Sequence, residues 1–235
     1  MHVAIRTLGR SHWAAERGLS LSKGHEAGVR ALQRIIDAAP DLDVDVLSVD
    51  LLPPECWRLP AADMDALQDA YADWLAELAG PWMRAGIAVR SLGRTRRRTP
   101  KLAAVLQRLE ATTQGGHHLR LGLAVDASSR AELLEHAARC GVEPSEEAFA
   151  SHYAAVTGLP NVDLLVRTGG GQRLGDFLLW QCAYAELFFS PIAWPDFTPA
   201  DLAAARRDFG GRERRFGGLG ARTTAMPEYG RREAG

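Results

Sequence analysis

The stretch "DLLVRTGGGQRLGDFLLWQCAYAELFFSPIAWPDF", residues 163–197, is the part of the chain most typical of an α/β protein, because a short apolar run leads into a glycine-rich turn. The apolar run predicts a strand, and Arg167 and Arg173 flank the three glycines that follow it. Glycines let a backbone approach a ligand closely, and two arginines can hold a phosphate or diphosphate through paired hydrogen bonds. Because glycine turns with arginines are equally common as plain surface loops, both interpretations stay open here.

A similar strand and glycine turn occurs at the N-terminus, in "HVAIRTLGRSHWAAERG", residues 2–18. Open α/β proteins bind their ligands at the carboxyl ends of strands, so this turn is a candidate site. It holds no carboxylate before Glu16 and is cationic instead. The polar residues that it offers are Arg6, Arg10, Ser11 and His12.

Apolar runs of strand length alternate with helical patterns along the rest of the chain. This alternation predicts an α/β fold, a single domain with a central, mostly parallel β-sheet flanked by helices on both faces. The long helix at 62–79 has an apolar stripe, and we expect a hydrophobic cleft beside it. The predicted strands cover residues 2–5, 44–52, 87–93, 118–126 and 162–170, and the predicted helices cover 25–39, 62–86, 101–113, 129–140 and 145–156.

Length and composition exclude several classes of protein. The 235 residues are 46% hydrophobic and 24% charged, as in an ordinary globular protein. A net charge of −1 argues against nucleic acid as a partner. The sequence has no run of about 18 apolar residues, so it predicts no transmembrane segment. The three cysteines are widely spaced and form no zinc pattern, so we expect a reducing, cytoplasmic location. We expect one domain over residues 1–218 and a flexible, polar C-terminal tail over 219–235.

Two charged features have more than one interpretation. Glu186 lies in an apolar, aromatic stretch, where a carboxylate needs an arginine or a metal ion as its partner. A structural ion pair is the simpler of these two readings. The basic run "RTRRRTP", residues 94–100, is interpreted as a solvated loop, with contact to an acidic partner or a membrane surface as the alternative.

Two C-terminal segments carry a family resemblance. The segment "RTGGGQRLGDFLLWQCAYAELFF" (167–189), followed by "WPDF" (194–197) and "RERRFGG" (212–218), closely resembles the cis-prenyltransferases, typified by undecaprenyl diphosphate synthase. Weaker matches upstream extend the resemblance over most of residues 2–218. These matches are "GHEAG" (24–28), "ECW" (55–57) and the Ser-Ser-Arg at 128–130, where the family usually has Gly-Gly-Arg.

The resemblance implies an enzyme that acts on prenyl diphosphates. Members of this family condense an allylic diphosphate with isopentenyl diphosphate, in cis geometry and with Mg²⁺, and they are usually dimers. It therefore implies a prenyltransferase with prenyl diphosphate substrates, Mg²⁺ as the cofactor and a homodimer, while a heterodimer with a paralogue stays open.

Roles for single residues follow from the same resemblance. Arg167 and Arg173 would hold the diphosphate of the isopentenyl-type substrate, and His25 would lie near the allylic diphosphate. Glu186 would be the carboxylate of the metal site, and Arg215 with Gly217 would reach the neighbouring subunit's site. The implied catalytic residues are His25, Arg167, Arg173 and Glu186, and the implied substrate-binding residues are Gly9, Arg10, His12, Arg30, Arg167, Arg173, Gly175, Arg215 and Gly217.

The chain departs from the family most strongly at the allylic site. Leu8 stands where the family has its metal-binding aspartate, and leucine cannot bind Mg²⁺, which needs hard oxygen ligands. Arg10 and His12 could act as cationic donors instead, or Asp50 could be a displaced oxygen ligand. The other departures are His12, Leu21 and Leu59 for arginines, Cys56 for an asparagine, Gln172 for a histidine and Gly175 for a serine.

Three functions are compatible with this pattern. The first is an active, divergent prenyltransferase, whose condensation is regular, irregular, cyclising or of short chain length. The second is a non-catalytic partner subunit of a heteromeric cis-prenyltransferase. The third is a prenyl diphosphate binding protein without turnover.

Overall fold

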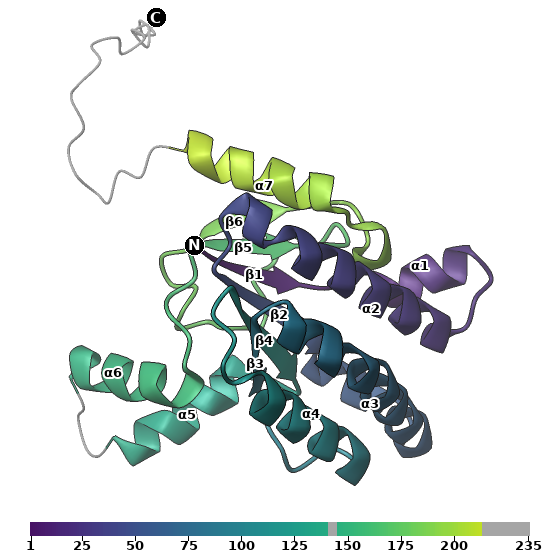
Figure 1. Ribbon diagram of the computed structural model, residues 1–235, viewed down its shortest axis with the longest axis horizontal. Coiled ribbons are helices and arrows are strands. Elements are labelled where there is room, and N and C mark those ends of the chain that lie inside the picture. The colour runs from purple at the N-terminus through teal and green to yellow at the C-terminus, as the bar shows by residue number, and fades with distance from the viewer. Residues whose placement is uncertain (141–144, 213–235) are drawn as a thin grey trace, which may run out of the picture.

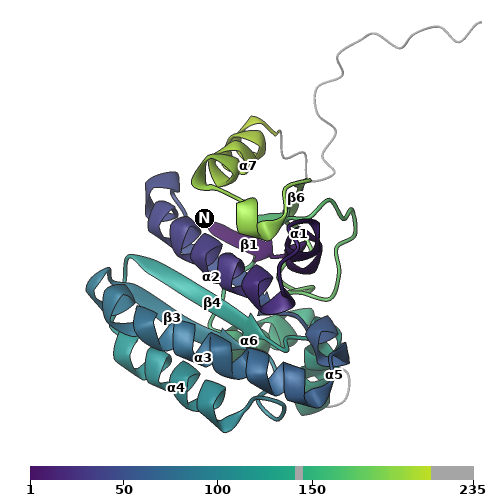
Figure 2. The ribbon, with the colours of Figure 1, turned by 90° about the vertical axis from the view of Figure 1, so that its right-hand side faces the viewer.

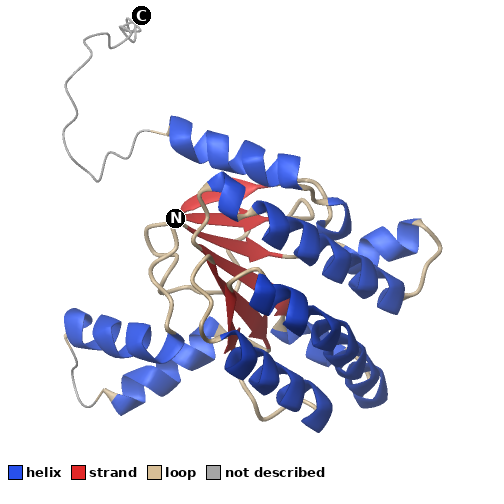
Figure 3. Ribbon diagram, in the orientation of Figure 1, coloured by secondary structure: helices blue, strands red, loops and turns tan. Residues whose placement is uncertain are grey.

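The computed structural model describes residues 1–140 and 145–212 and builds them around one parallel sheet. Its six strands follow the order β3-β4-β2-β1-β5-β6, and each neighbouring pair is parallel (Figure 3). The predicted α/β fold is therefore confirmed. The strands are β1 (His2–Arg6), β2 (Val46–Leu52), β3 (Ile87–Leu92), β4 (Leu119–Val125), β5 (Leu164–Arg167) and β6 (Glu186–Phe189).

Helices cover the sheet on both faces. Helices α2, α3, α4 and α7 lie on one face, and α5 and α6 lie on the other (Figures 1 and 2). This three-layer arrangement buries β1 and β2 along their whole length, which explains why both read as continuous apolar runs. The helices are α1 (Arg10–Glu16), α2 (Leu21–Ala38), α3 (Ala61–Arg84), α4 (Pro100–Thr113), α5 (Ser129–Arg139), α6 (Glu146–Thr157) and α7 (Pro199–Gly211).

The five predicted strands and five predicted helices are present, with small differences at their ends. The predicted strand at 162–170 is too long, because β5 ends at Arg167. Gly169 and Gly170 both have φ of +76°, a left-handed conformation that stops an extended strand. Sequence reasoning gave no strand at β6 and no helix at α7, although α7 begins with a capping box at Thr198.

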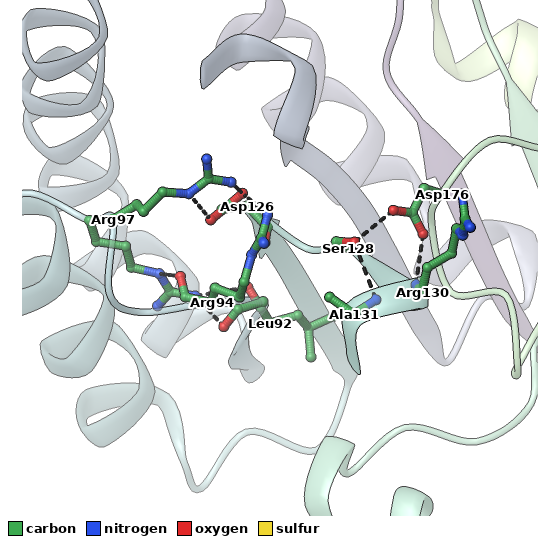
Figure 4. Close-up of polar contacts among 10 residues, drawn as sticks. Leu92, Arg94, Arg97, Asp126, Ser128, Arg130, Ala131 and Asp176 are labelled. Carbon is green, nitrogen blue, oxygen red and sulfur yellow. Dashed lines mark hydrogen bonds and ion pairs between the residues drawn. The ribbon is translucent and has the colours of Figure 1, made fainter. Parts of the chain in front are cut away.

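The interpretation of residues 94–100 as a solvated loop is wrong for three of its arginines, whereas Arg96 is exposed. Arg94 and Arg97 both bind the carboxylate of Asp126, which is fully buried after β4 (Figure 4). Arg98 donates to the Leu92 carbonyl at 2.8 Å and to the Ser91 hydroxyl at 2.7 Å. The run therefore fastens the carboxyl end of β3 to that of β4, since a buried carboxylate needs cationic partners.

Two further expectations concern a membrane span and the C-terminal tail. Of the helices in residues 1–140 and 145–212, none combines the length and the apolarity that a membrane span requires. The boundary at residue 218 and the tail at 219–235 lie outside the described residues, and both stay predictions.

Candidate active site

A cavity of about 440 Å³ lies at the carboxyl ends of β1 and β2, where a parallel sheet places its ligands. It is walled by the N-terminal turn, the start of α2 and the segment after β2. The replacements that the sequence shows at the allylic site converge here and make the wall apolar. The lining residues are Thr7, Leu8, Gly9, Arg10, Ser11, His12, Leu21, His25, Pro53, Glu55, Cys56, Arg58 and Leu59.

A second cavity of about 290 Å³ lies beside the first part of α3. Both cavities are lined by Leu21 and Leu59, so they adjoin each other. Ala66 and Leu67 of α3 form one wall. This places an apolar hollow beside the long helix, where the sequence predicts a hydrophobic cleft.

The N-terminal turn is held rigidly at the mouth of the first cavity. The Leu8 N–H donates to Thr168 Oγ1 at 2.9 Å, and the Leu8 carbonyl accepts from the Trp194 N–H at 2.9 Å. Gly9 has φ of +91°, and a Cβ there would lie 2.9 Å from the Cβ of Ala193, so both conformation and space require glycine. The backbone therefore fixes where the side chain at position 8 stands.

Three predicted cationic residues take different positions around this turn. The Arg10 side chain is 5% exposed, lines the cavity and donates to Thr7 Oγ1 at 2.8 Å. His12 lines the rim, with its side chain 81% exposed and 3.0 Å from Glu16. Arg30 lies on the solvent face of α2, paired with Glu26 at 2.7 Å, so the structure does not bring it to the cavity.

His25 is brought to the cavity by the first turns of α2. Its ring is buried, and Nδ1 lies 2.9 Å from the Tyr71 hydroxyl. Burial, aided by the positive charge of Arg10, lowers the pKa of His25 to about 3. The imidazole is therefore neutral at neutral pH, and it offers a ligand a hydrogen bond rather than a positive charge.

This neutral histidine predicts a pH-dependent stability. The pKa is lowered on folding, so the unfolded state binds the extra proton between about pH 6.5 and 3, and stability falls as pH drops through that window. From pH 7 to 5 the His25 contribution is about 2 kcal/mol. Urea unfolding at both values should show a smaller loss for His25→Gln than for wild type.

Tyr71→Phe is the matched control for this measurement. It removes the hydrogen bond to His25 but leaves the burial, which is the main cause of the shift. We expect it to lower stability by a similar amount at pH 7 and pH 5. Equal losses for wild type and His25→Gln between the two pH values would contradict the neutral assignment.

The glycine-rich loop after β5 packs onto Arg167. Gly171 lies so close that a Cβ would stand 2.7 Å from Arg167 Nη2, and the Arg167 guanidinium donates to the Arg173 carbonyl. The N–H groups of Gly169 and Gly170 bond to the Ile192 and Ser190 carbonyls at 2.7 and 2.9 Å. The N–H groups of Gly169 and Gly170 are therefore not free to bind a ligand. These glycines serve close packing instead.

The rest of this loop holds an exposed arginine, Arg173, and an aspartate, Asp176, that hydrogen bonds keep in place. Arg173 is exposed and makes no hydrogen bond or ion pair with side chains in the described ranges. Three residues later, Asp176 accepts from the Ser128 hydroxyl at 2.7 Å and from the Arg130 N–H at 2.9 Å (Figure 4). Since Ser128 is the N-cap of α5, Asp176 ties the loop to the start of that helix.

Arg6, which the sequence offered only as one of the polar residues of the N-terminal turn, is buried at the site. It is the last residue of β1, its side chain is 3% exposed, and it pairs across the sheet with Arg167. Its Nη2 donates to Glu55 Oε1 at 2.8 Å, and its Nε lies 3.6 Å from Asp50 Oδ2. The hypothesis that Asp50 is a displaced metal ligand is therefore not supported, because this buried carboxylate lies against a guanidinium.

Glu186 does not meet these residues within one chain. It begins β6 and pairs with Leu164 at the start of β5, whereas the cavity lies beyond the opposite ends of the strands. Its side chain is 29% exposed and forms an ion pair with Arg212 at 2.8 Å. The expected arginine partner is thus present, and the metal role of Glu186 stays a prediction. Arg215 and Gly217 lie outside the described residues.

The residues around the cavity do not fit Mg²⁺. Over residues 1–140 and 145–212, no group of three or more His, Cys, Asp or Glu side chains could hold a metal ion. Leu8 offers no oxygen, and Glu55 is bound by Arg6. No chemistry is therefore assigned to Mg²⁺ within a single chain.

The sequence model of undecaprenyl diphosphate synthases matches residues 8–217, which is most of the chain. The protein belongs to this family of cis-prenyltransferases. A cis-prenyltransferase relative, isoprenyl transferase 1 of Bradyrhizobium diazoefficiens, is 42% identical over 97% of this chain and 92% of its own length. The resemblance seen in the sequence is therefore confirmed, and with it a prenyltransferase enzyme.

Two solved structures share the fold. Lavandulyl diphosphate synthase from Lavandula x intermedia, in complex with dimethylallyl diphosphate, gives a TM-score of 0.86 at 30% identity over 92% of this chain and 97% of that one. A probable undecaprenyl diphosphate synthase from Campylobacter jejuni gives 0.75 at 26% identity, with the same coverage. The names of these relatives, a transferase and two synthases, favour a transferase over the partner-subunit and binding-protein alternatives.

Proposed function

We propose that this cis-prenyltransferase condenses an allylic diphosphate with an isopentenyl-type diphosphate. The allylic carbon–oxygen bond breaks and diphosphate leaves with the electron pair. The double bond of the second substrate attacks the allylic carbon and forms the new carbon–carbon bond, and the resulting carbocation loses a proton to form a new double bond. The cytoplasm is the compartment that we assign to this reaction.

One observation carries the proposal: Arg167 at the end of β5 and Arg173 on the loop after it lie at the carboxyl edge of the sheet, where the apolar cavity also lies. Arg167 and Arg173 would hold one diphosphate through paired hydrogen bonds. Arg10, buried in the wall of the cavity, supplies a fixed positive charge near a leaving diphosphate. The adjoining hollow beside α3 accepts an apolar prenyl chain.

The test is turnover by the purified full-length chain. Dimethylallyl, geranyl or farnesyl diphosphate is supplied with and without isopentenyl diphosphate, each with Mg²⁺ or with EDTA, and the products are identified by mass spectrometry. We expect a prenyl product from at least one pair. Absence of product in every combination would remove the proposal, and product only on addition of a paralogue would favour the partner-subunit function.

A homodimer belongs to the same proposal. Strand β6 is an edge of the sheet, and the side chains of Phe189 and Tyr184 near it are 39% and 81% exposed. An unpaired strand edge with exposed aromatic side chains is typical of a surface that another chain covers. Sedimentation velocity on the purified chain measures the association state, and a monomer at micromolar concentration would contradict the dimer.

A further inference from the structure

We propose that Arg6 is a third arginine of the diphosphate site formed by Arg167 and Arg173, and that its guanidinium takes the place of the side-chain hydroxyl that position 175 lacks. The inference rests on the proposed function, because it names a further binding residue in the same site. The diphosphate is the common chemical group of either substrate, so inorganic pyrophosphate serves as the probe.

Sheet register places Arg6 beside Arg167. The two residues are direct partners on neighbouring parallel strands, so their side chains leave the same face of the sheet about 5 Å apart. Both are the last residues of their strands and both are buried, with 3% of Arg6 and 8% of Arg167 exposed. Two adjacent guanidiniums at a strand end form a site for an anion with oxygens to accept from both.

Arg6 retains hydrogen-bonding capacity for such an anion. Within the described residues, its Nε and Nη1 have no hydrogen-bond partner, although both are buried, and Arg167 Nε is in the same state. Buried N–H groups of a charged side chain are costly to leave unpaired. A bound phosphate oxygen would satisfy them.

The loop leaves room for this guanidinium because position 175 is glycine. A Cβ at Gly175 would overlap Arg6 Nη1 and would lie 2.7 Å from Arg6 Cζ. Arg6 thus fills the volume that a serine side chain would need. The hydroxyl that position 175 lacks and the guanidinium that Arg6 supplies face the same space beneath the loop.

Two carboxylates keep the positive charge of Arg6 in place before a ligand binds. Glu55 accepts from Nη2 at 2.8 Å, and Asp50 lies 3.6 Å from Nε. Glu55 is 52% exposed and also lines the cavity, so it can turn into solvent when an anion arrives. The contact with Asp50 is too long for a hydrogen bond, which leaves Nε free to donate elsewhere.

Calorimetric binding of inorganic pyrophosphate to the full-length chain tests the assignment. Arg6→Gln should weaken binding by about 10- to 100-fold, as expected for loss of hydrogen bonds between charged groups. Arg6→Gln leaves the Asp50 carboxylate without its cationic partner. The double variant Arg6→Gln/Asp50→Asn replaces both by uncharged side chains, which protects the fold, and it should show the same loss of pyrophosphate affinity. Arg139→Gln, which removes an exposed arginine paired with Glu135, should bind like wild type.

The outcomes separate this inference from the proposed function. If both Arg6 variants bind pyrophosphate like wild type while Arg173→Ala does not, the inference is wrong and the site stands without Arg6. If the Arg6 variants lose binding but wild type turns over no prenyl pair, the inference holds and the proposed reaction fails. No pyrophosphate binding by wild type would overturn the inference directly.

Discussion

Arg173→Ala should lower kcat/KM for the condensation, and the affinity for isopentenyl diphosphate, on the order of 100-fold or more. The loop presents this guanidinium to solvent without a partner among the described side chains, so a diphosphate gains its full bidentate contact. Two hydrogen bonds between charged groups contribute about 3 kcal/mol or more, which corresponds to that factor. Steady-state kinetics and calorimetry measure the two quantities.

The exposed position of Arg173 makes this test clean. Because its side chain is exposed and makes no hydrogen bond or ion pair with the described side chains, the melting temperature of Arg173→Ala should stay close to that of wild type. Arg108→Ala removes an equally exposed arginine from α4 and is the matched control. Affinity for isopentenyl diphosphate that is unchanged in Arg173→Ala would exclude this residue from the site.

Leu8→Asp should strengthen the dependence of the reaction on Mg²⁺. The hydrogen bonds of the Leu8 backbone with Thr168 and Trp194 hold position 8 at the mouth of the cavity, so the new carboxylate would stand where a leaving diphosphate is expected. A carboxylate supplies the hard oxygen that Mg²⁺ prefers, and metal stabilisation of a leaving anion is worth several kcal/mol. We expect the ratio of rates in Mg²⁺ and in EDTA to rise on the order of 100-fold above the wild-type ratio.

Leu8→Asn is the control for size and polarity. It has the shape of aspartate without the charge, so its rate should not respond to Mg²⁺ more than that of wild type. If Leu8→Asp and Leu8→Asn respond alike, position 8 does not contact the metal. A wild type that is strongly stimulated by Mg²⁺ would show that the ligands come from outside the residues described in one chain.

The central part of the fold could be predicted because burial on two faces leaves a simple pattern. Strands such as β1 and β2 are apolar throughout, and only a covered parallel strand gives that pattern. Strand β6 could not be found in this way, since it is four residues long, half exposed and at the edge of the sheet. Helix α7 was missed although the Pro199 and Asp201 pattern of its first turn is visible in the sequence.

The candidate site was predicted where residues follow a strand end directly. Gly9, Arg10 and His25 do meet at one cavity, because parallel strands deliver their carboxyl ends to the same edge. Arg30, five residues after His25 on α2, does not lie at the cavity. The sequence alone does not show which side of the helix faces the cavity. A specific role for Arg6 could have been predicted from one signal: an arginine ends the first apolar strand and an aspartate interrupts the second.

The bond between Asp176 and the first turn of α5 joins the ligand loop to a helix on the far side of the sheet. Ser128 and the Arg130 N–H are the groups that it holds, so the start of α5 and the resting shape of the loop share one carboxylate. A diphosphate that moves the loop must either break this contact or carry the helix start with it. By linkage, a ligand at the first turn of α5 that favours or breaks this contact would change affinity for the diphosphate by the same factor as the diphosphate changes affinity for that ligand. The start of α5 is therefore the place on the other face of the sheet from which the position of the loop could be altered.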